Sequence, residues 1–304
     1  MSLCPICSTM LPPASIVSPD RGQATRGRFE VAICPVCAAG VTLPLVDASE
    51  LESFYPSGYG PHTQLDGPIV ALISSAIRRW QGFRSRRRPP LQALRGVAPG
   101  RGLDIGAGRG DVSAMLAADG WRMTAVEPSP TAVATMLERG IDAREGVLGT
   151  VVLERAGYDI ALFQHSLEHT IDPVADLRRA HSALRPGGLL LVSVPNFGSW
   201  QRRAFRSNWY HLDLPRHRVH FAGATLERAL TVAGFTGVRL HHSSSAVGLP
   251  ASLQYLAAGR CLFPDGLRLR IATAMCALAL PFTMVLDRLL GDGDTLHAVA
   301  RRGN

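Results

Sequence analysis

Three alternating glycines follow an acidic residue in the segment DIGAGRG, residues 104–110. The segment stands between an apolar run and a helical pattern, where glycines let the backbone approach a ligand at the carboxyl edge of a sheet. The next apolar run ends in Glu127, 17 residues after Gly110. A carboxylate at that place can accept hydrogen bonds from both hydroxyls of a ribose. The two features together indicate a ribose-containing ligand.

The charge of this segment distinguishes between classes of such ligands. Dinucleotide-binding proteins present G-x-G-x-x-G and a helix N-terminus to a pyrophosphate. Here the spacing is G-x-G-x-G, and Asp104 directly precedes the loop. A carboxylate repels a pyrophosphate, whereas it attracts an ammonium or a sulfonium group. The pattern therefore favours a cationic ligand over a dinucleotide.

Four cysteines form two C-x2-C pairs, Cys4/Cys7 and Cys34/Cys37, with 26 residues between the pairs. Such pairs suit a tetrahedral zinc ion held by four thiolates. Redox-active or metal-free thiols are the alternatives. Because four protein ligands close the coordination shell, the metal would stabilise this module rather than take part in chemistry.

The elements that must position these residues follow an alternating βα pattern from residue 102 onward. Strands are expected at 102–106, 121–127, 158–164, 187–196, 235–242 and 295–301, and helices at 109–120, 129–140, 173–184 and 224–234. The pattern predicts a doubly wound, Rossmann-like α/β domain, expected to have seven strands, over residues 95–304. Residues 1–45 are expected to form the zinc-binding module, and residues 46–94 a linker.

Five ordered motifs resemble class I S-adenosylmethionine (SAM)-dependent methyltransferases of the bacterial branch with L-E-H…D-P and P-R-H signatures. They are LDIGAGRG, Glu127, GYDIALFQHSLEHTIDP, LRPGGLLLVSVPN and NWYHLDLPRHRVHF. The resemblance covers about residues 95–243 and the final strand. It implies that the glycine loop surrounds the methionine part of SAM and that Glu127 binds the ribose. The adenine would lie beside 144–149 (REGVLG), which lacks the acid that many relatives have. The implied cofactor-binding residues are Asp104, Gly106, Ala107, Gly108, Gly110, Glu127, Pro128, Val147, Leu148 and Gln164.

The N-terminal cysteine pairs are similar to the zinc modules that precede deoxysugar C-methyltransferases. A tyrosine-rich segment follows the cysteines in those proteins, as Tyr55 and Tyr59 follow them here. The similarity implies that these tyrosines contact the substrate.

Methyl transfer from a sulfonium needs mainly positioning, and a base only where the acceptor must lose a proton. The resemblance places His169 in the active site as the first candidate for the base; it could instead brace its helix. His165 is the second candidate, with packing against the cofactor as its alternative role.

A second polar cluster lies at residues 210–220, where Tyr210, His211 and His217 suit a substrate-binding lid. His211 is the third candidate for the base. A metal held by His211, Asp213 and His217 is a less favoured interpretation. Asn196, which ends the strand 187–196, is expected to point toward the acceptor.

The net charge of +8 (32 basic minus 24 acidic residues) raises the question of an anionic partner. All of the basic residues are arginine, and six of them crowd into residues 78–88, after an apolar helical pattern at 68–80. That segment suits a packed helix with a solvated loop, a membrane-surface helix or an RNA-facing patch. The N-terminal residues show neither a basic region nor a long apolar stretch of a secretory signal, so a cytoplasmic protein is expected.

Residues 246–291 interrupt the sheet before its last strand and contain 16 uncharged residues at 271–286. This run is shorter than the ~20 residues that span a bilayer. It is therefore expected to form a buried helix, a contact with a second copy of the chain, or an element that lies on the inner face of a membrane.

The function that the sequence favours is methyl transfer from SAM to a small molecule: a sugar, a sugar nucleotide or a lipid-linked envelope intermediate. An RNA or protein methyltransferase is one alternative, and a non-catalytic zinc-containing scaffold with this fold is another. The extra segments are apolar rather than aromatic and basic, so they offer few stacking platforms for bases. Nucleic acid is accordingly the disfavoured partner.

Overall fold

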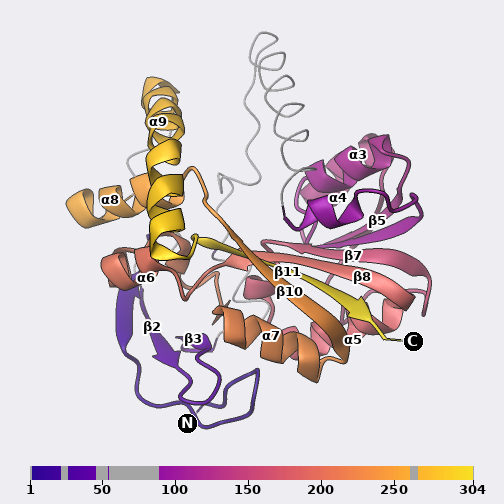
Figure 1. The fold of residues 1–304 in the computed structure, drawn as a ribbon, viewed down its shortest axis with the longest axis horizontal. Coiled ribbons are helices and arrows are strands. Elements are labelled where there is room, and N and C mark those ends of the chain that lie inside the picture. Colours follow the sequence, from indigo (N-terminus) through magenta and orange to yellow (C-terminus); the bar gives the residue numbers. More distant parts are fainter. Residues whose placement is uncertain (1, 22–26, 46–53, 55–88, 261–265, 304) are drawn as a thin grey trace.

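The structure is a computed structural model, and it describes residues 2–21, 27–45, 54, 89–260 and 266–303 (Figure 1). Tyr55 and Tyr59, the expected helix at 68–80 and the arginine-rich segment at 78–88 lie outside the described residues. In the last helix, side chains are described from residue 278.

A seven-stranded mixed sheet forms the centre of the molecule, in the order β10-β11-β8-β7-β4-β5-β6. Its strands are β4 (Arg101–Ile105), β5 (Arg122–Glu127), β6 (Asp142–Glu145), β7 (Tyr158–Gln164), β8 (Leu184–Pro195), β10 (Phe235–Ser243) and β11 (Thr295–Arg302). The strands from β8 to β6 pair in parallel, whereas β11 runs antiparallel between β8 and β10. The Rossmann-like sheet predicted from the sequence is confirmed.

Helices cover both faces of this sheet (Figure 1). The helices α3 (Asp111–Ala118) and α4 (Pro130–Glu138) pack on one face, and α5 (Pro173–Ala183) and α7 (Gly223–Val232) on the other. Side-chain caps begin two of them: Ser129 Oγ accepts from the Ala132 amide, and the Asp172 carboxylate accepts from the Ala175 amide. A proline follows each cap, at the first position of the helix, where its missing N–H costs no hydrogen bond.

A second, four-stranded sheet joins the N-terminal residues to the main domain. β1 (Ile16–Pro19), β2 (Arg28–Ile33) and β3 (Gly40–Leu43) are continued by β9 (Val219–His220), which pairs with β3. Arg216, which is fully buried, bonds Asp20 at 2.8 Å and Asp213 at 2.6 Å. Strand pairing and a buried ion pair thus cross the boundary expected near residue 45; the division into domains stays a prediction.

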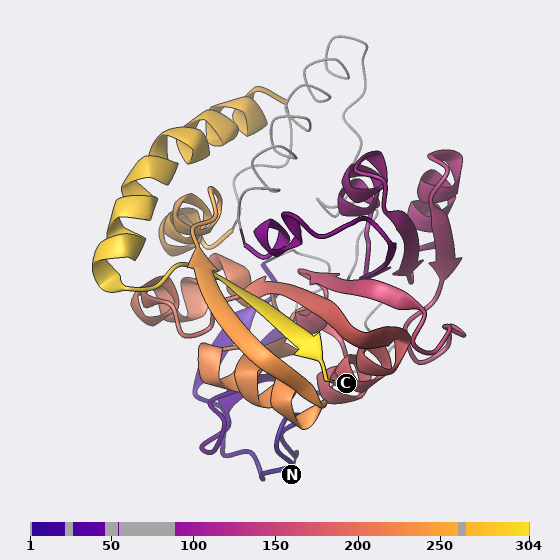
Figure 2. The same cartoon turned by 45° about the vertical axis from the view of Figure 1, so that its right-hand side comes forward.

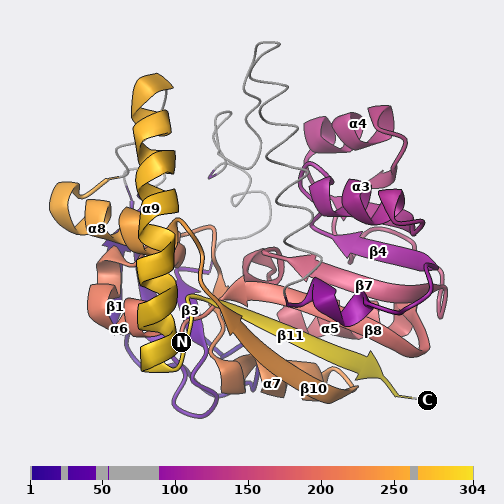
Figure 3. The ribbon, with the colours of Figure 1, turned by 45° about the horizontal axis from the view of Figure 1, so that its top comes forward.

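Two helices lie between β10 and β11: α8 (Gly248–Ala258) and α9 (Gly266–Leu290). Figures 2 and 3 show α9 standing beside the sheet rather than covering either of its faces. α8 packs against α6 (Trp200–Phe205), against the short helix η5 (Tyr210–Leu212) and against α9. Within the described part of the chain, no helix has the length and apolar character needed to cross a membrane.

Candidate active site

The glycine loop between β4 and α3 has the backbone conformation that the sequence suggests. Gly106, Gly108 and Gly110 have φ angles of 68°, 56° and 71°. A Cβ on Gly106 would lie 2.5 Å from the Cβ of Ser166, so the loop can pack against the end of β7 only with glycine there. A Cβ on Gly108 would meet no described atom within 4 Å. The loop is therefore closed toward the sheet and open at Gly108, where a ligand can approach the backbone.

Glu127 ends β5 directly beside this loop and is 6% exposed. Its Oε2 accepts a hydrogen bond from the Gly108 amide at 2.8 Å, and its Oε1 accepts one from the Ser129 amide at 3.0 Å. The carboxylate is thus fixed in orientation before any ligand binds. Each oxygen retains acceptor capacity that suits a ribose hydroxyl. Pro128, the next residue, is exposed.

Asp104 is the second carboxylate of the site and is 1% exposed. One of its oxygens accepts a 2.7 Å hydrogen bond from the Ser113 hydroxyl, and the other has no partner among the described atoms. Burial raises the pKa of Asp104 to about 6. The hydrogen bond from Ser113 lowers this pKa, and the charge of Glu127 raises it. An unpartnered buried carboxylate oxygen is costly, and a cationic ligand would relieve that cost.

The sequence predicts where these carboxylates lie but not every contact that they make. The positions of Asp104 and Glu127 at strand ends follow from the sequence. The contact between Asp104 and Ser113 was not predicted, because nothing in the sequence distinguishes this serine from others in the helix.

The other expected cofactor residues occupy different environments. Ala107 packs against the core beside α4, and Leu148 is buried in the main core. Val147 is half-exposed. Gln164 ends β7, and its buried Nε2 has no hydrogen-bond partner within the described region. Their contacts with a cofactor stay predictions.

Glu168, in the short helix η3 (Leu167–His169), is the centre of a cluster of histidines. It is 1% exposed, and its Oε1 lies 3.6 Å from His165 Nδ1 and 4.0 Å from His217 Nε2. The rings of His169 and His217 meet edge to face at 4.7 Å. Burial disfavours ionisation of Glu168, but its interaction with His165 and the charges of the histidines outweigh burial and lower its pKa to about 2. The cluster therefore contains a buried, ionised carboxylate.

The histidines of this cluster differ in exposure and in their partners. The His165 side chain is half-exposed, and its residue adopts φ +54° just after β7. Partial desolvation of the ring lowers the pKa of His165, but the interaction with Glu168 more than offsets this and raises the pKa above its ordinary value. His169 donates from Nδ1 to the Arg216 carbonyl at 3.1 Å. Burial, together with the charge of His169, lowers the pKa of His217 to about 4.

The expected lid residues tie this region to neighbouring elements. His211 Nε2 lies 3.2 Å from Asp294 Oδ2, next to β11, and the His211 carbonyl accepts from His217 Nδ1 at 2.9 Å. The Tyr210 amide donates to Ser252 Oγ of α8 at 2.9 Å. Because His211 is directed to Asp294, the structure disfavours a metal shared by His211, Asp213 and His217. Substrate contacts by Tyr210 and His217 stay predictions.

Asn196 is buried at the carboxyl end of β8, and its amide is engaged by the protein. Its Nδ2 donates to the Gly293 carbonyl at 2.8 Å, and its Oδ1 accepts from the Gly198 amide at 3.0 Å. These bonds hold the chain that enters β11. A contact with the acceptor, expected from the sequence, stays a prediction.

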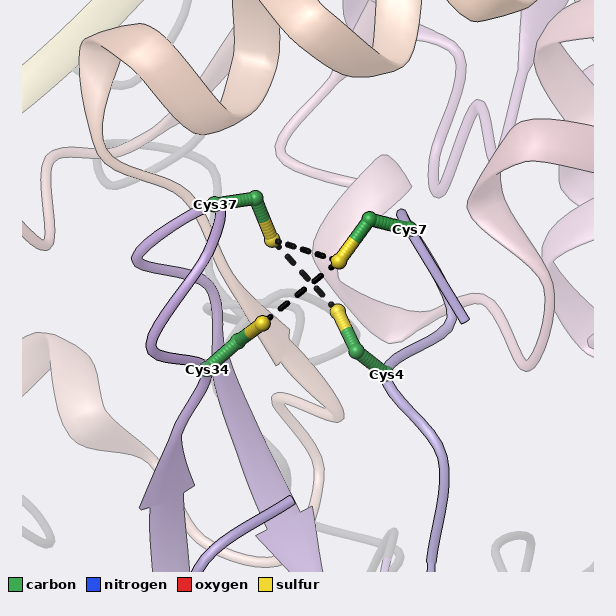
Figure 4. A group of neighbouring side chains, drawn as sticks. All are labelled: Cys4, Cys7, Cys34 and Cys37. Atoms are coloured by element: carbon green, nitrogen blue, oxygen red, sulfur yellow. Dashed lines mark hydrogen bonds between the residues drawn. The ribbon is translucent and has the colours of Figure 1, made fainter. Parts of the chain in front are cut away.

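The four N-terminal cysteines converge on one point (Figure 4). Their Sγ atoms lie 3.5 Å (Cys4–Cys37), 3.5 Å (Cys7–Cys34) and 3.6 Å (Cys7–Cys37) apart, and all four lie within 4.8 Å of one another. Four sulfurs at ~2.3 Å from a tetrahedral zinc would be about 3.8 Å apart. The arrangement is thus close to that of a zinc–thiolate site.

Both cysteine pairs adopt the same turn. The Cys4 amide donates to the Thr9 carbonyl, and the Cys34 amide donates to the Ala39 carbonyl five residues on in the same way. Ser8 and Ala38, at matching positions, both have φ +58°. Burial raises the pKa of the Cys4 and Cys37 thiols. Burial acts in the same sense on Cys7, but hydrogen bonds with Thr9 and with the other sulfurs lower its pKa to about 6. A nearby cation would favour the thiolate form of all four.

The sheet order, the glycine loop and the carboxylates at the strand ends are typical of α/β domains that bind nucleoside-like ligands at the carboxyl edge of the sheet. Residues 76–240, more than half of the chain, match the methyltransferase domain family. The chain belongs to this family.

Two curated relatives are ubiquinone biosynthesis O-methyltransferases. The protein from Methylobacterium sp. (strain 4-46) is 35% identical over 173 residues, which are 51% of this chain and 66% of the relative. The protein from Methylobacterium nodulans is 33% identical over 133 residues, 42% of this chain and 51% of the relative. The chain thus spans about half to two thirds of the length of these two relatives.

A solved structure with the same fold is a SAM-dependent methyltransferase from Archaeoglobus fulgidus. It superposes with a TM-score of 0.50 at 18% sequence identity, covering 74% of this chain and 94% of that protein. At this identity the similarity shows the fold.

Proposed function

We propose that the protein transfers a methyl group from SAM to a small-molecule acceptor at the carboxyl edge of the sheet. The observation that carries this proposal is the pair of carboxylates beside the open glycine loop, one fixed by two amides and the other with an unpartnered oxygen. This donor set suits SAM, because ribose hydroxyls would bond Glu127 and the positive charges of the ligand would lie near Asp104. When bound, SAM supplies an electrophilic methyl group.

The residues of the chain would then position and activate the acceptor. Glu127 and the loop orient the ligand, and the acidic pair makes the site favourable for a cation. Where the acceptor must lose a proton, His165 is the best-placed base, because it is half-exposed at the strand end and Glu168 stabilises its protonated form. This places His165 ahead of His169, which is less exposed, and of His211, whose Nε2 pairs with Asp294.

The choice of base has a direct test. His165→Asn should lower kcat strongly and leave SAM affinity within about twofold, and its pH–rate profile should lose the limb that reports the histidine. His169→Asn is the matched comparison. A larger kcat loss in His169→Asn than in His165→Asn would reverse the assignment.

The acceptor class that we favour is a small molecule with an apolar or lipid-linked part, such as a lipid-linked sugar of the cell envelope. Two observations support it. The lid residues adjoin the helix α8, since the Tyr210 amide is hydrogen-bonded to Ser252 of that helix. The two relatives are named for the biosynthesis of ubiquinone. Labelled methyl recovered in a solvent-extractable fraction would support this class. Label removed by ribonuclease would favour the RNA alternative instead.

We also propose that Cys4, Cys7, Cys34 and Cys37 hold one structural zinc ion. The convergence of the four sulfurs and the matched turns support this assignment. Cys4, Cys34 and Cys37 are buried and share the main core, so the ion would stabilise the fold rather than contact the acceptor.

A further inference from the structure

In the described part of α9, polar residues face the protein and large apolar residues face outward. Thr283 and Asp287 face inward and are buried, and Asp287 accepts a 2.6 Å hydrogen bond from the Trp200 indole. On the outer side, Leu278 is 80% exposed, Phe282 62% and Leu289 76%. A surface helix of a water-soluble domain normally turns its apolar side inward and its polar side outward.

The exposed apolar face of α9 is wide. At about 100° per residue, the exposed positions from Met284 through Leu278 and Val285 to Phe282 cover roughly half of the helix circumference. A coiled-coil seam is narrower, with only two positions in seven. Helix α8, which packs against α9, adds Leu253 and Leu256, both exposed. We call these residues of α8 and α9 the apolar face.

Charges at the apolar face have one sign. Arg260 follows α8, and Arg288 lies among the exposed leucines of α9. The acidic side chains of the described residues 247–294 are turned away or paired: Asp287 and Asp294 are buried, and Asp292 pairs with Arg203 at 3.2 Å. The chain as a whole carries a net charge of +8.

We propose that the apolar face docks on the surface of a lipid bilayer that contains anionic headgroups. Leu278, Phe282 and Leu289 would enter the boundary between headgroups and acyl chains, and the arginines would meet the phosphates. A second copy of the chain fits this face less well, because a two-fold contact would bring arginines together with no exposed acid in the described hairpin to pair with them.

The position of this face relative to the site gives docking a consequence. Asp287 is bonded to Trp200 of α6, and Ser252 of α8 is bonded to the Tyr210 amide. Docking would therefore bring the lid residues next to the bilayer, where a lipid-linked acceptor could enter. The proposal itself does not depend on methyl transfer, since it rests on the surface of α8 and α9.

Vesicle flotation tests the proposal on the whole chain. The wild type is compared with Phe282→Glu/Leu289→Glu, which changes two exposed residues and no described core contact. The matched control is Leu137→Glu/Val152→Glu, which places the same charges on exposed apolar residues elsewhere. Flotation is measured with vesicles of phosphatidylcholine mixed with phosphatidylglycerol and with vesicles of phosphatidylcholine alone.

We expect the wild type and the control to float with the mixed vesicles and to bind phosphatidylcholine alone more weakly. The double variant should bind the mixed vesicles at least about tenfold more weakly, because two large apolar side chains no longer leave water. A circular dichroism spectrum and a denaturant midpoint that match those of the wild type would show that the variant is folded. The proposal would be overturned if the wild type failed to float or if the double variant floated as well as the wild type. It would also be overturned if the double substitution only converted a dimer to a monomer in light scattering. A wild type that floats with the vesicles but transfers no methyl group from SAM would instead count against the proposed function.

Discussion

Replacing Glu127 by alanine is the most informative perturbation of the proposed cofactor site. Its carboxylate is positioned by the amides of Gly108 and Ser129, so two well-oriented acceptors are ready for the ribose. A hydrogen bond to a charged group contributes about 1.5 kcal/mol at the lower end of its range, and two of them about 3 kcal/mol. This corresponds to about a hundredfold increase in the Kd for SAM. The part-buried amides left without a partner would lower the free energy of unfolding by about 1 kcal/mol.

Isothermal titration calorimetry with SAM measures this effect directly. The matched control is Glu227→Ala, because Glu227 is an exposed glutamate of α7, on the opposite face of the sheet from α3 and α4. We expect the control to bind SAM as the wild type does. If folded Glu127→Ala bound SAM within about twofold of the wild type, the assignment of the ribose site, and the reasoning from its geometry, would be refuted.

Three further predictions concern pH, metal and stability. Because burial raises the pKa of Asp104 to about 6 and a cationic ligand favours the ionised form, SAM affinity should rise about tenfold between about pH 5 and 7.5; calorimetry should show no such rise in Asp104→Asn. Metal analysis should find about one zinc per chain in the wild type. Cys34→Ser should contain less zinc, whereas Cys276→Ser, whose cysteine is not part of a C-x2-C pair, should contain as much as the wild type. Equal zinc in all three proteins would refute the site. Arg216→Met should lower the free energy of unfolding by about 3–5 kcal/mol, since it leaves Asp20 buried without this partner. Arg185→Met removes an exposed side chain that pairs with the largely buried Asp159, and it should change the free energy of unfolding by less than about 1 kcal/mol. Equal denaturant midpoints for the two variants would contradict this.

The sequence predicts the central sheet well because its inner strands are continuous apolar runs. β4, β5 and β7 begin and end within about one residue of expectation. β6 was not among the expected strands, since its sequence DARE has no apolar run and its residues are at most half-buried. An edge strand of this kind is defined by its neighbour β5 rather than by its own pattern.

Contacts between distant segments are the part of the site that the sequence does not predict. β3 pairs with β9, which follows most of the central sheet in the sequence, and Arg216 bonds Asp20 across 196 residues of sequence. The role of Glu168 depends on His217, which a loop brings back to η3. Strand and helix periodicity contain no information about such pairings. The spacing of the cysteines was enough to predict their local arrangement, because each C-x2-C pair forms its own turn.

The most direct test of the central claim is transfer of labelled methyl from SAM into a fractionated cell lysate, with the wild type, Glu127→Ala and Glu227→Ala side by side. We predict label in a small-molecule, solvent-extractable fraction with the wild type and Glu227→Ala, and only a small fraction of that label with Glu127→Ala. Label in no fraction from a wild type that binds SAM, or label found only in ribonuclease-sensitive material, would contradict it.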